Sequence, residues 1–157
     1  MRLVLFAVLA ATLVACSPGA GGAAPSVAKV VHPESGLEVI PLTVTSANGT
    51  HSFKVEVARS AMEQAKGLMF RTKLGPGEGM IFTMSPPRGA SFWMRNTVIS
   101  LDLIFIAPDG RISNIAANAI PYDETPLLSI GAVKAVLEIP GGRAAELGIA
   151  PGDKVSW

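Results

Sequence analysis

Short apolar runs separated by turn residues are the feature of this sequence that most limits its possible folds. Asn48-Gly49 and Asp109-Gly110 each lie between two such runs, and these dipeptides favour the positive φ angles of tight hairpin turns. The runs of strand length cover residues 37–45, 50–58, 79–84, 91–97, 101–107, 111–117, 132–139 and 154–157. The pattern predicts a mainly β domain of about eight strands.

Only two short stretches have helical character. The first begins at Ser60, where Glu63 completes a capping box, and it ends around Gly67. The second, from Gly142 to Leu147, is barely two turns long. Neither stretch could form a helical domain, so the expected class is α+β, mainly β, with two short helices.

The N-terminus has the pattern of an export signal. Met1-Arg2 precedes an apolar run, and the sequence Leu-Val-Ala leads directly into Cys16, which resembles a bacterial lipobox. This pattern predicts a lipoprotein signal peptide over residues 1–15 and a lipid attached to Cys16, which would be the contact with the membrane. The alternative is an ordinary signal peptide in which Cys16 is incidental.

Small residues follow the cysteine from position 17 to position 28 and offer nothing large to bury. We therefore expect residues 16–35 to be the lipidated cysteine and a flexible tether, and residues 36–157 to be a single domain. The predicted location is the cell envelope, on the periplasmic face. Ser17 is compatible with an outer membrane where the host has one, because the usual inner-membrane retention residue there is Asp.

Composition and charge argue against several functional classes. Charged residues are 16% of the chain and the net charge is +1, so no basic stripe is available to bind nucleic acid. Cys16 is the only cysteine, and His32 and His51 lack the spacing of a zinc site. With no nucleotide-binding or hydrolase motif either, we expect no metal and no cofactor.

An ordered series of segments resembles the domain-of-unknown-function family 192, the UPF0127 proteins. The segments are QAKGLMFR at residues 64–71, GMIF at 79–82, SFWMRNT at 91–97, LDLIFI at 101–106, VLE at 136–138 and GIAPGDKV at 148–155. The resemblance covers residues 52–157. It implies a compact, mostly β, barrel-like α+β fold that is often exported, and it supplies no catalytic residues because the family has no agreed molecular function. We expect the sheet to be antiparallel.

Residues 91–97 concentrate aromatic, thioether, cationic and amide groups in one predicted strand. Alternation would put Phe92, Met94 and Asn96 on one face, with Trp93 and Arg95 on the other. Asn96 would then be partly buried and in need of partners. The alternative is that Asn96 and the following threonine form a tight turn that leads into Leu101.

Arg71 follows an apolar run, so its guanidinium would emerge from apolar surroundings. There it could hold the carboxylate of a ligand, or it could form an internal ion pair with Asp102 or Glu138. Asp102 alternates with isoleucines on the strand at residues 101–106, and an acid in such a position usually has a partner.

The leading hypothesis is a membrane-anchored binding or accessory domain for a small molecule or a peptide. The candidate pocket residues are Met69, Arg71, Trp93, Met94, Asn96, Asp102 and Glu138. One alternative is an envelope enzyme with Asp102 or Glu138 as general acid or base and Arg71 holding an anionic substrate. The other is a structural or interaction protein, which would expose a large apolar patch.

Overall fold

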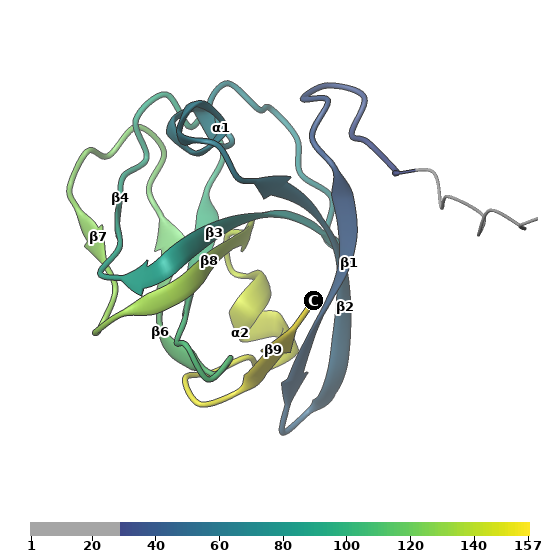
Figure 1. The fold of residues 1–157 in the computed structure, drawn as a ribbon, viewed down its shortest axis with the longest axis vertical. Coiled ribbons are helices and arrows are strands. Elements are labelled where there is room, and N and C mark those ends of the chain that lie inside the picture. The colour runs from purple at the N-terminus through teal and green to yellow at the C-terminus, as the bar shows by residue number, and fades with distance from the viewer. Residues whose placement is uncertain (1–28) are drawn as a thin grey trace, which may run out of the picture.

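The computed structural model describes residues 29–157 and shows a strongly curled sheet with two short helices (Figure 1). The elements are β1 (Val39–Ser46), β2 (Gly49–Ala58), α1 (Ala61–Lys66), β3 (Glu78–Arg88), β4 (Ser91–Phe92), β5 (Leu101–Ile106), β6 (Ile112–Ala119), β7 (Leu127–Leu128), β8 (Val133–Pro140), α2 (Arg143–Leu147) and β9 (Lys154–Ser156). The expected class, α+β and mainly β, is confirmed. Cys16 lies outside the described residues, as do the predicted signal peptide and most of the tether.

Seven strands form the main sheet in the order β6-β5-β8-β3-β2-β1-β9, while β4 and β7 pair separately. The hairpins predicted around Asn48-Gly49 and Asp109-Gly110 are present as β1–β2 and β5–β6. One detail differs from the expected antiparallel sheet, because β2 pairs with β3 in parallel. A parallel pair needs a crossover connection, and α1 lies within the connection between these two strands.

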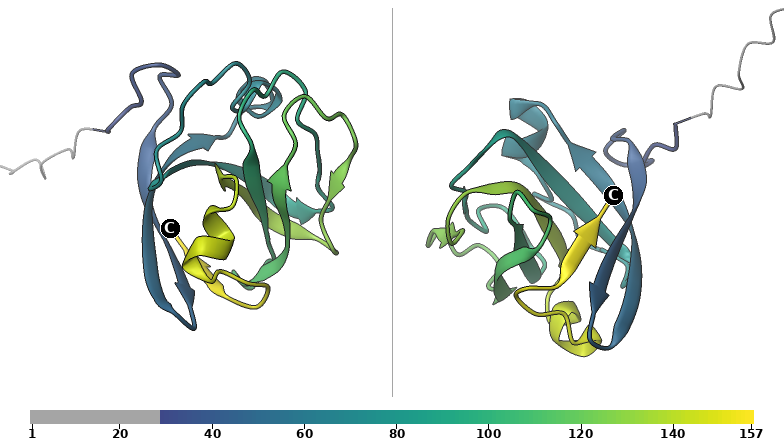
Figure 2. Two further views of the ribbon diagram at one scale, coloured as in Figure 1. Left: turned by 180° about the vertical axis from the view of Figure 1, so that it is seen from behind. Right: turned by 60° about the horizontal axis from the view of Figure 1, so that its bottom comes forward.

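The sheet curls until its two edge strands meet. The amide of Val155 in β9 donates to the carbonyl of Gly110 at 2.9 Å, and the amide of Ile112 in β6 donates to the carbonyl of Asp153 at 2.9 Å. The second view in Figure 2 shows β9 beside the turn that leads into β6. These bonds satisfy part of each exposed edge, which would otherwise be a site for unwanted strand pairing.

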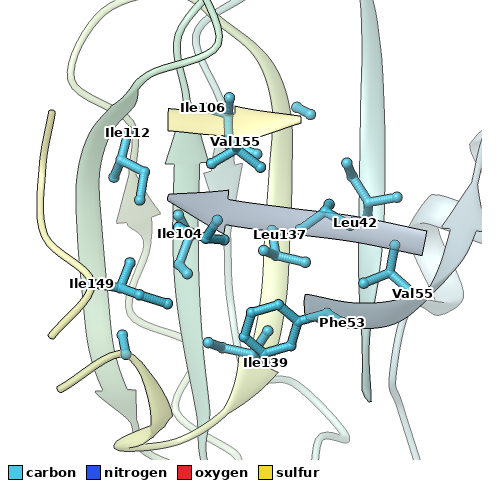
Figure 3. Packing of buried hydrophobic residues seen from close by; sticks show 14 of the residues in the cluster. Leu42, Phe53, Val55, Ile104, Ile106, Ile112, Leu137, Ile139, Ile149 and Val155 are labelled. Carbon is cyan, nitrogen blue, oxygen red and sulfur yellow. The ribbon is translucent and has the colours of Figure 1, made fainter. Parts of the chain in front are cut away.

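Two hydrophobic cores lie on opposite faces of this sheet. The inner core fills the curl and includes Phe53, Ile104 and Leu137 (Figure 3). The outer core includes Phe82, Phe105 and Val136, and loops from residues 67–77 and 89–100 help to cover it. The central strands β5 and β8 lie between the two cores. All six residues of β5 are therefore buried, as its apolar sequence predicts.

The predicted strand over residues 91–97 is wrong beyond its first two residues. Only Ser91 and Phe92 form β4. Asn96 has a φ of 54°, and the backbone turns there instead of extending, so the alternative of a tight turn before Leu101 holds. The physical reason is that this segment crosses the outer core as a covering loop, and its backbone bonds to other loops instead of a strand: Met94 donates to the carbonyl of Asp123 at 2.8 Å.

Residues 29–35 belong to the predicted tether, and they lie against the curled sheet. Val31 forms a β-bridge with Glu38, and the amide of Val39 donates to the carbonyl of Val30 at 2.8 Å. No helix among residues 29–157 is long and apolar enough to cross a membrane.

Candidate functional site

A cavity of about 360 Å³ opens on the outer face of the sheet. We call it the Glu138 pocket. It is lined by residues 64–69 of α1 and the turn after it, by Phe82, Met84 and Arg88 of β3, by residues 89–93 with Arg95 and Thr97, and by Glu138 of β8. The volume is in the range of ordinary small-molecule sites.

Local structure fixes the helix that forms one wall. Ser60 and Glu63 make the capping box that the sequence predicts: the amide of Glu63 donates to the Ser60 hydroxyl at 3.2 Å, and the amide of Ser60 donates to the Glu63 carboxylate at 2.7 Å. Gln64 then ties the helix to the sheet, because its Nε2 donates to the carbonyls of Ala58 at 3.2 Å and Thr83 at 2.8 Å. The wall is therefore anchored at both its start and its middle.

Glu138 is the unusual residue of this pocket. It is only 5% exposed and lies between Met80 of β3 and Leu103 of β5 in the sheet register. Among the hydrogen bonds and ion pairs of residues 29–157, none involves its carboxyl group. Burial raises the pKa of Glu138 from its ordinary value of 4.5 to about 8, because the charged form loses its hydration without gaining a partner.

The carboxyl group is nevertheless reachable from the cavity. Within residues 29–157, every fully enclosed side-chain nitrogen or oxygen has a hydrogen-bond partner. Since the Glu138 carboxyl has none, its oxygens must retain some contact with the pocket that they line. Glu138 is thus a nearly buried acid at the floor of an open cavity.

The mouth of the pocket carries three cations. Lys66, Arg88 and Arg95 are all exposed and all line the cavity. Arg95 lies over the ring of Trp93, 5.7 Å from its centroid, and its Nε is 3.8 Å from a carboxylate oxygen of the exposed Glu124. Among residues 29–157, neither Lys66 nor Arg88 makes an ion pair. The pocket therefore has a carboxyl at its floor and positive charge at its entrance.

Backbone strain is concentrated around the same loops. Phe70 and Tyr122 have φ angles of 63°, and Asn96 has one of 54°; this conformation is rare for aromatic residues. The three positions belong to connected loops, since the Phe70 amide donates to the Asn96 carbonyl at 2.8 Å and the Tyr122 amide donates to the Met94 carbonyl at 3.1 Å. Strain of this kind persists where the surrounding structure imposes it, often beside functional sites.

The structure brings three of the seven candidate residues into the Glu138 pocket: Met69, Trp93 and Glu138. Asn96 is beside the pocket, with its Nδ2 3.8 Å from the sulfur of Met69. Met94 is only 1% exposed and belongs to the outer core.

Arg71 lines a neighbouring cavity of about 280 Å³ and is occupied by an internal ion pair. Its partner is Glu56, and not Asp102 or Glu138 as the sequence suggested. The two Arg71–Glu56 bonds measure 2.9 and 3.2 Å, and Arg71 Nε lies 3.1 Å from Glu34. Burial acts to lower the pKa of Arg71, but the hydrogen bonds and charge of Glu56, together with the charges of Glu34 and Glu78, outweigh it and raise the pKa. Ser35 also donates to Glu56, so this cluster fastens residues 32–35 to β2.

Asp102 points away from the Glu138 pocket. Its carboxylate accepts hydrogen bonds from the amides of Asn118 at 2.7 Å, Gly142 at 2.9 Å and Ala144 at 2.8 Å. It therefore holds the start of α2 and the end of β6 against β5. Both carboxylate oxygens are therefore occupied by backbone amides, and the role of Asp102 is structural.

Four residues that line the Glu138 pocket were not among the predicted site residues: Lys66, Arg88, Phe92 and Arg95. Phe92 and Arg95 lie in the unusual segment at residues 91–97, but the predicted strand put them on opposite faces. Arg88 follows Pro86-Pro87 at the end of β3. No local pattern marks Lys66.

Two solved structures share this fold and much of this sequence. A protein of unknown function from Novosphingobium aromaticivorans is 61% identical, with a TM-score of 0.81; the match covers 89% of this chain and 100% of that one. A protein from Sinorhizobium meliloti proposed to be a transcription regulator is 36% identical, with a TM-score of 0.74, and the match covers 76% of this chain and 94% of that one. A comparison with curated proteins finds no match.

The remaining comparison is with protein families. The family DUF192, described as an uncharacterized ACR, matches residues 43–157, which contain every residue that lines the Glu138 pocket. The chain belongs to the DUF192 family.

Proposed function

We propose that this protein is a lipid-anchored envelope domain that binds a small molecule or a short peptide segment in the Glu138 pocket. The observation that carries this proposal is the Glu138 carboxyl, which is nearly buried at the floor of a cavity and has no partner among the described residues. Buried polar groups in native proteins are almost always paired. A ligand that supplies the missing partner explains why the acid is kept there.

The rest of the lining supports recognition. Apolar side chains such as Leu68, Phe82 and Phe92 line part of the cavity, and charged and polar side chains line the rest. A concave site that combines apolar surface with polar and charged groups suits a ligand that carries both kinds of group. The strained turns around the pocket fix the loops that carry these side chains.

A second candidate function is enzymatic, and the raised pKa of Glu138 favours it. An acid with a pKa of about 8 is protonated at neutral pH and can donate a proton to a bound substrate. Asp102 does not serve this alternative, because three backbone amides hold its carboxylate. Arg71 is paired with Glu56, so Lys66 and Arg88 would hold an anionic substrate in its place.

The test of the binding function is a thermal-shift screen of small molecules and short peptides against the protein and its Glu138→Gln variant. A ligand at one hundred times its Kd adds about 2.7 kcal/mol of stability, which raises the Tm by roughly 10 °C for a domain of this size. A ligand that stabilises the protein but not the folded variant supports the proposal. Ligands that act equally on both proteins, or no ligand at all, would count against it.

The same screen separates the two candidate functions. Any ligand that depends on Glu138 is incubated with the protein and followed by mass spectrometry. An unchanged ligand favours a binding domain, whereas a product that forms with the protein and not with the Glu138→Gln variant favours an enzyme.

The anchoring part of the proposal rests on the sequence pattern before Cys16 and on the small residues after it. We expect cells that express the full chain to incorporate labelled palmitate into it, and a Cys16→Ser variant to lose both the label and membrane attachment. A Cys16→Ser variant that remains in the membrane fraction would contradict lipid anchoring.

A further inference from the structure

We propose that the ligand of the Glu138 pocket is a small zwitterion, whose amine pairs with Glu138 and whose carboxylate is held by Lys66 and Arg88. This inference rests on the proposed binding function and adds the chemical class of the ligand. Its basis is the separation of charge inside one cavity, with an acid at the floor and cations at the mouth.

The floor calls for a cationic group. The carboxyl of Glu138 has apolar neighbours on both adjacent strands, Met80 and Leu103, and Leu68, Phe82 and Phe92 line the same cavity. Ionised Glu138 would be a buried charge without a partner, which carries a large electrostatic penalty, and a cationic ligand beside it would offset that penalty. A ligand ammonium supplies both a positive charge and hydrogen-bond donors to the two carboxyl oxygens.

The mouth calls for an anionic group. Lys66 and Arg88 make no ion pair among the described residues, and Glu138 is the only carboxylic acid in the lining. Arg95 adds a third positive charge, since its contact with Glu124 is long and exposed. The entrance therefore attracts anions, and a planar carboxylate matches the guanidinium of Arg88.

The two ends together distinguish a zwitterion from simpler ligands. A plain carboxylate satisfies only the mouth, and a plain amine satisfies only the floor and must pass three cations to reach it. An aliphatic segment between the two charges would lie against Leu68, Phe82 and Phe92. A cavity of about 360 Å³ limits the ligand to the size of an amino acid or a very short peptide.

The amine brings a proton balance that can be measured. At pH 7 the Glu138 carboxyl is mostly protonated, because burial raises its pKa to about 8. Binding of an ammonium would convert the acid to a carboxylate: the O–H bond breaks, its proton goes to the buffer, and the ammonium keeps its own protons. Roughly one proton is therefore released for each zwitterion bound near neutral pH.

The experiment is calorimetry with a series of ω-amino acids of three to eight carbons. Hexanoate, hexylamine and hexanol serve as matched probes that lack one or both charges. We expect the best ω-amino acid to bind at least tenfold more tightly than hexanoate and hexylamine. Titrations in phosphate and in Tris at pH 7 should differ in heat by the ionisation of about one buffer proton, which is the signature of Glu138 losing its own.

Substitutions test which residues of the pocket bind each charged group of the ligand. Glu138→Gln should abolish the proton release and the preference for zwitterions, and Lys66→Gln with Arg88→Gln should weaken binding of ω-amino acids and hexanoate but not of hexylamine. Lys73→Gln replaces an exposed lysine outside the Glu138 pocket and should leave all affinities unchanged.

Three outcomes would overturn the inference. Hexanoate or hexanol could bind as tightly as every ω-amino acid, or proton release could persist in Glu138→Gln. Alternatively, none of these probes could bind while another ligand from the thermal-shift screen depends on Glu138, which would reject the zwitterion and leave the binding function standing. If nothing in either experiment depends on Glu138, both proposals fail.

Discussion

Replacing Glu138 with glutamine should stabilise the protein, and the gain should grow with pH. Glutamine has nearly the same shape as protonated glutamate, so near pH 4.5 the two proteins should have similar free energies of unfolding. As the pH rises, the unfolded wild-type chain ionises Glu138 with its ordinary pKa of 4.5, while the folded chain resists ionisation until about pH 8. The folded state therefore binds more protons in this window.

Proton linkage sets the direction in which stability changes with pH. Stability falls with rising pH wherever the folded state binds more protons than the unfolded state. The wild type should thus lose stability between about pH 4.5 and pH 8, and the Glu138→Gln variant should not show this loss. A difference of one pKa unit between folded and unfolded chains corresponds to about 1.4 kcal/mol. The variant should therefore be more stable by about 3 kcal/mol at pH 7 and by about 5 kcal/mol above pH 8.

Urea unfolding between pH 4.5 and pH 8.5 measures this difference, and subtracting the two proteins cancels the other titrating groups. Glu146→Gln is a suitable control, because Glu146 is exposed and its ion pair with Arg143 lies at the surface; its effect should stay below about 1 kcal/mol. A wild-type-minus-variant difference that does not change with pH would refute the argument that burial without a partner controls the Glu138 pKa.

Three further substitutions test other parts of the structure, each by urea unfolding. Asp102→Asn should lower the free energy of unfolding by about 3 kcal/mol without changing ligand binding, because the asparagine side chain cannot accept hydrogen bonds from all three backbone N–H groups. A change below about 1 kcal/mol would contradict the structural role of Asp102. Arg71→Met should cost about 3 kcal/mol or more, since it leaves Glu56 buried without its partner, and adding Glu56→Gln should recover part of the loss; no recovery would argue against pairing as the cause. Gly79→Ala should cost about 2 kcal/mol, because an added Cβ would lie 2.5 Å from the carbonyl of Glu138; an unchanged midpoint would show that the strands can separate at little cost.

Local features of the fold were predictable because their causes are local. Ser60 and Glu63 form their capping box from neighbouring residues alone, and Asn48-Gly49 and Asp109-Gly110 form hairpin turns through their own backbone preferences. None of these features depends on how distant segments meet.

The candidate site was only partly predictable because tertiary packing overrides local pattern there. Residues 91–97 have strand-like composition, yet the segment becomes a covering loop that bonds to the turn around Asp123 and continues through Asn96 with a positive φ. This change brings Phe92 to the same cavity as Trp93 and Arg95, although a strand would have put Phe92 on the opposite face. Tertiary packing also decides the partner of Arg71, which pairs with Glu56 of β2 instead of with Asp102 or Glu138.

The sequence by itself indicated most of the strands, both hairpins, the two helices and the family, although the strand predicted over residues 91–97 ends at Phe92. The partners of each strand and the environment of Glu138 were decided only by the tertiary structure. In β8, Leu137 and Ile139 face the inner core, so alternation alone would put Glu138 on the solvent side, where a glutamate is unremarkable. The loops that fold over the outer face bury that side as well. They turn an ordinary surface acid into an unpartnered carboxyl at the floor of a pocket, because desolvation depends on what covers a residue in space and not on its neighbours in the chain.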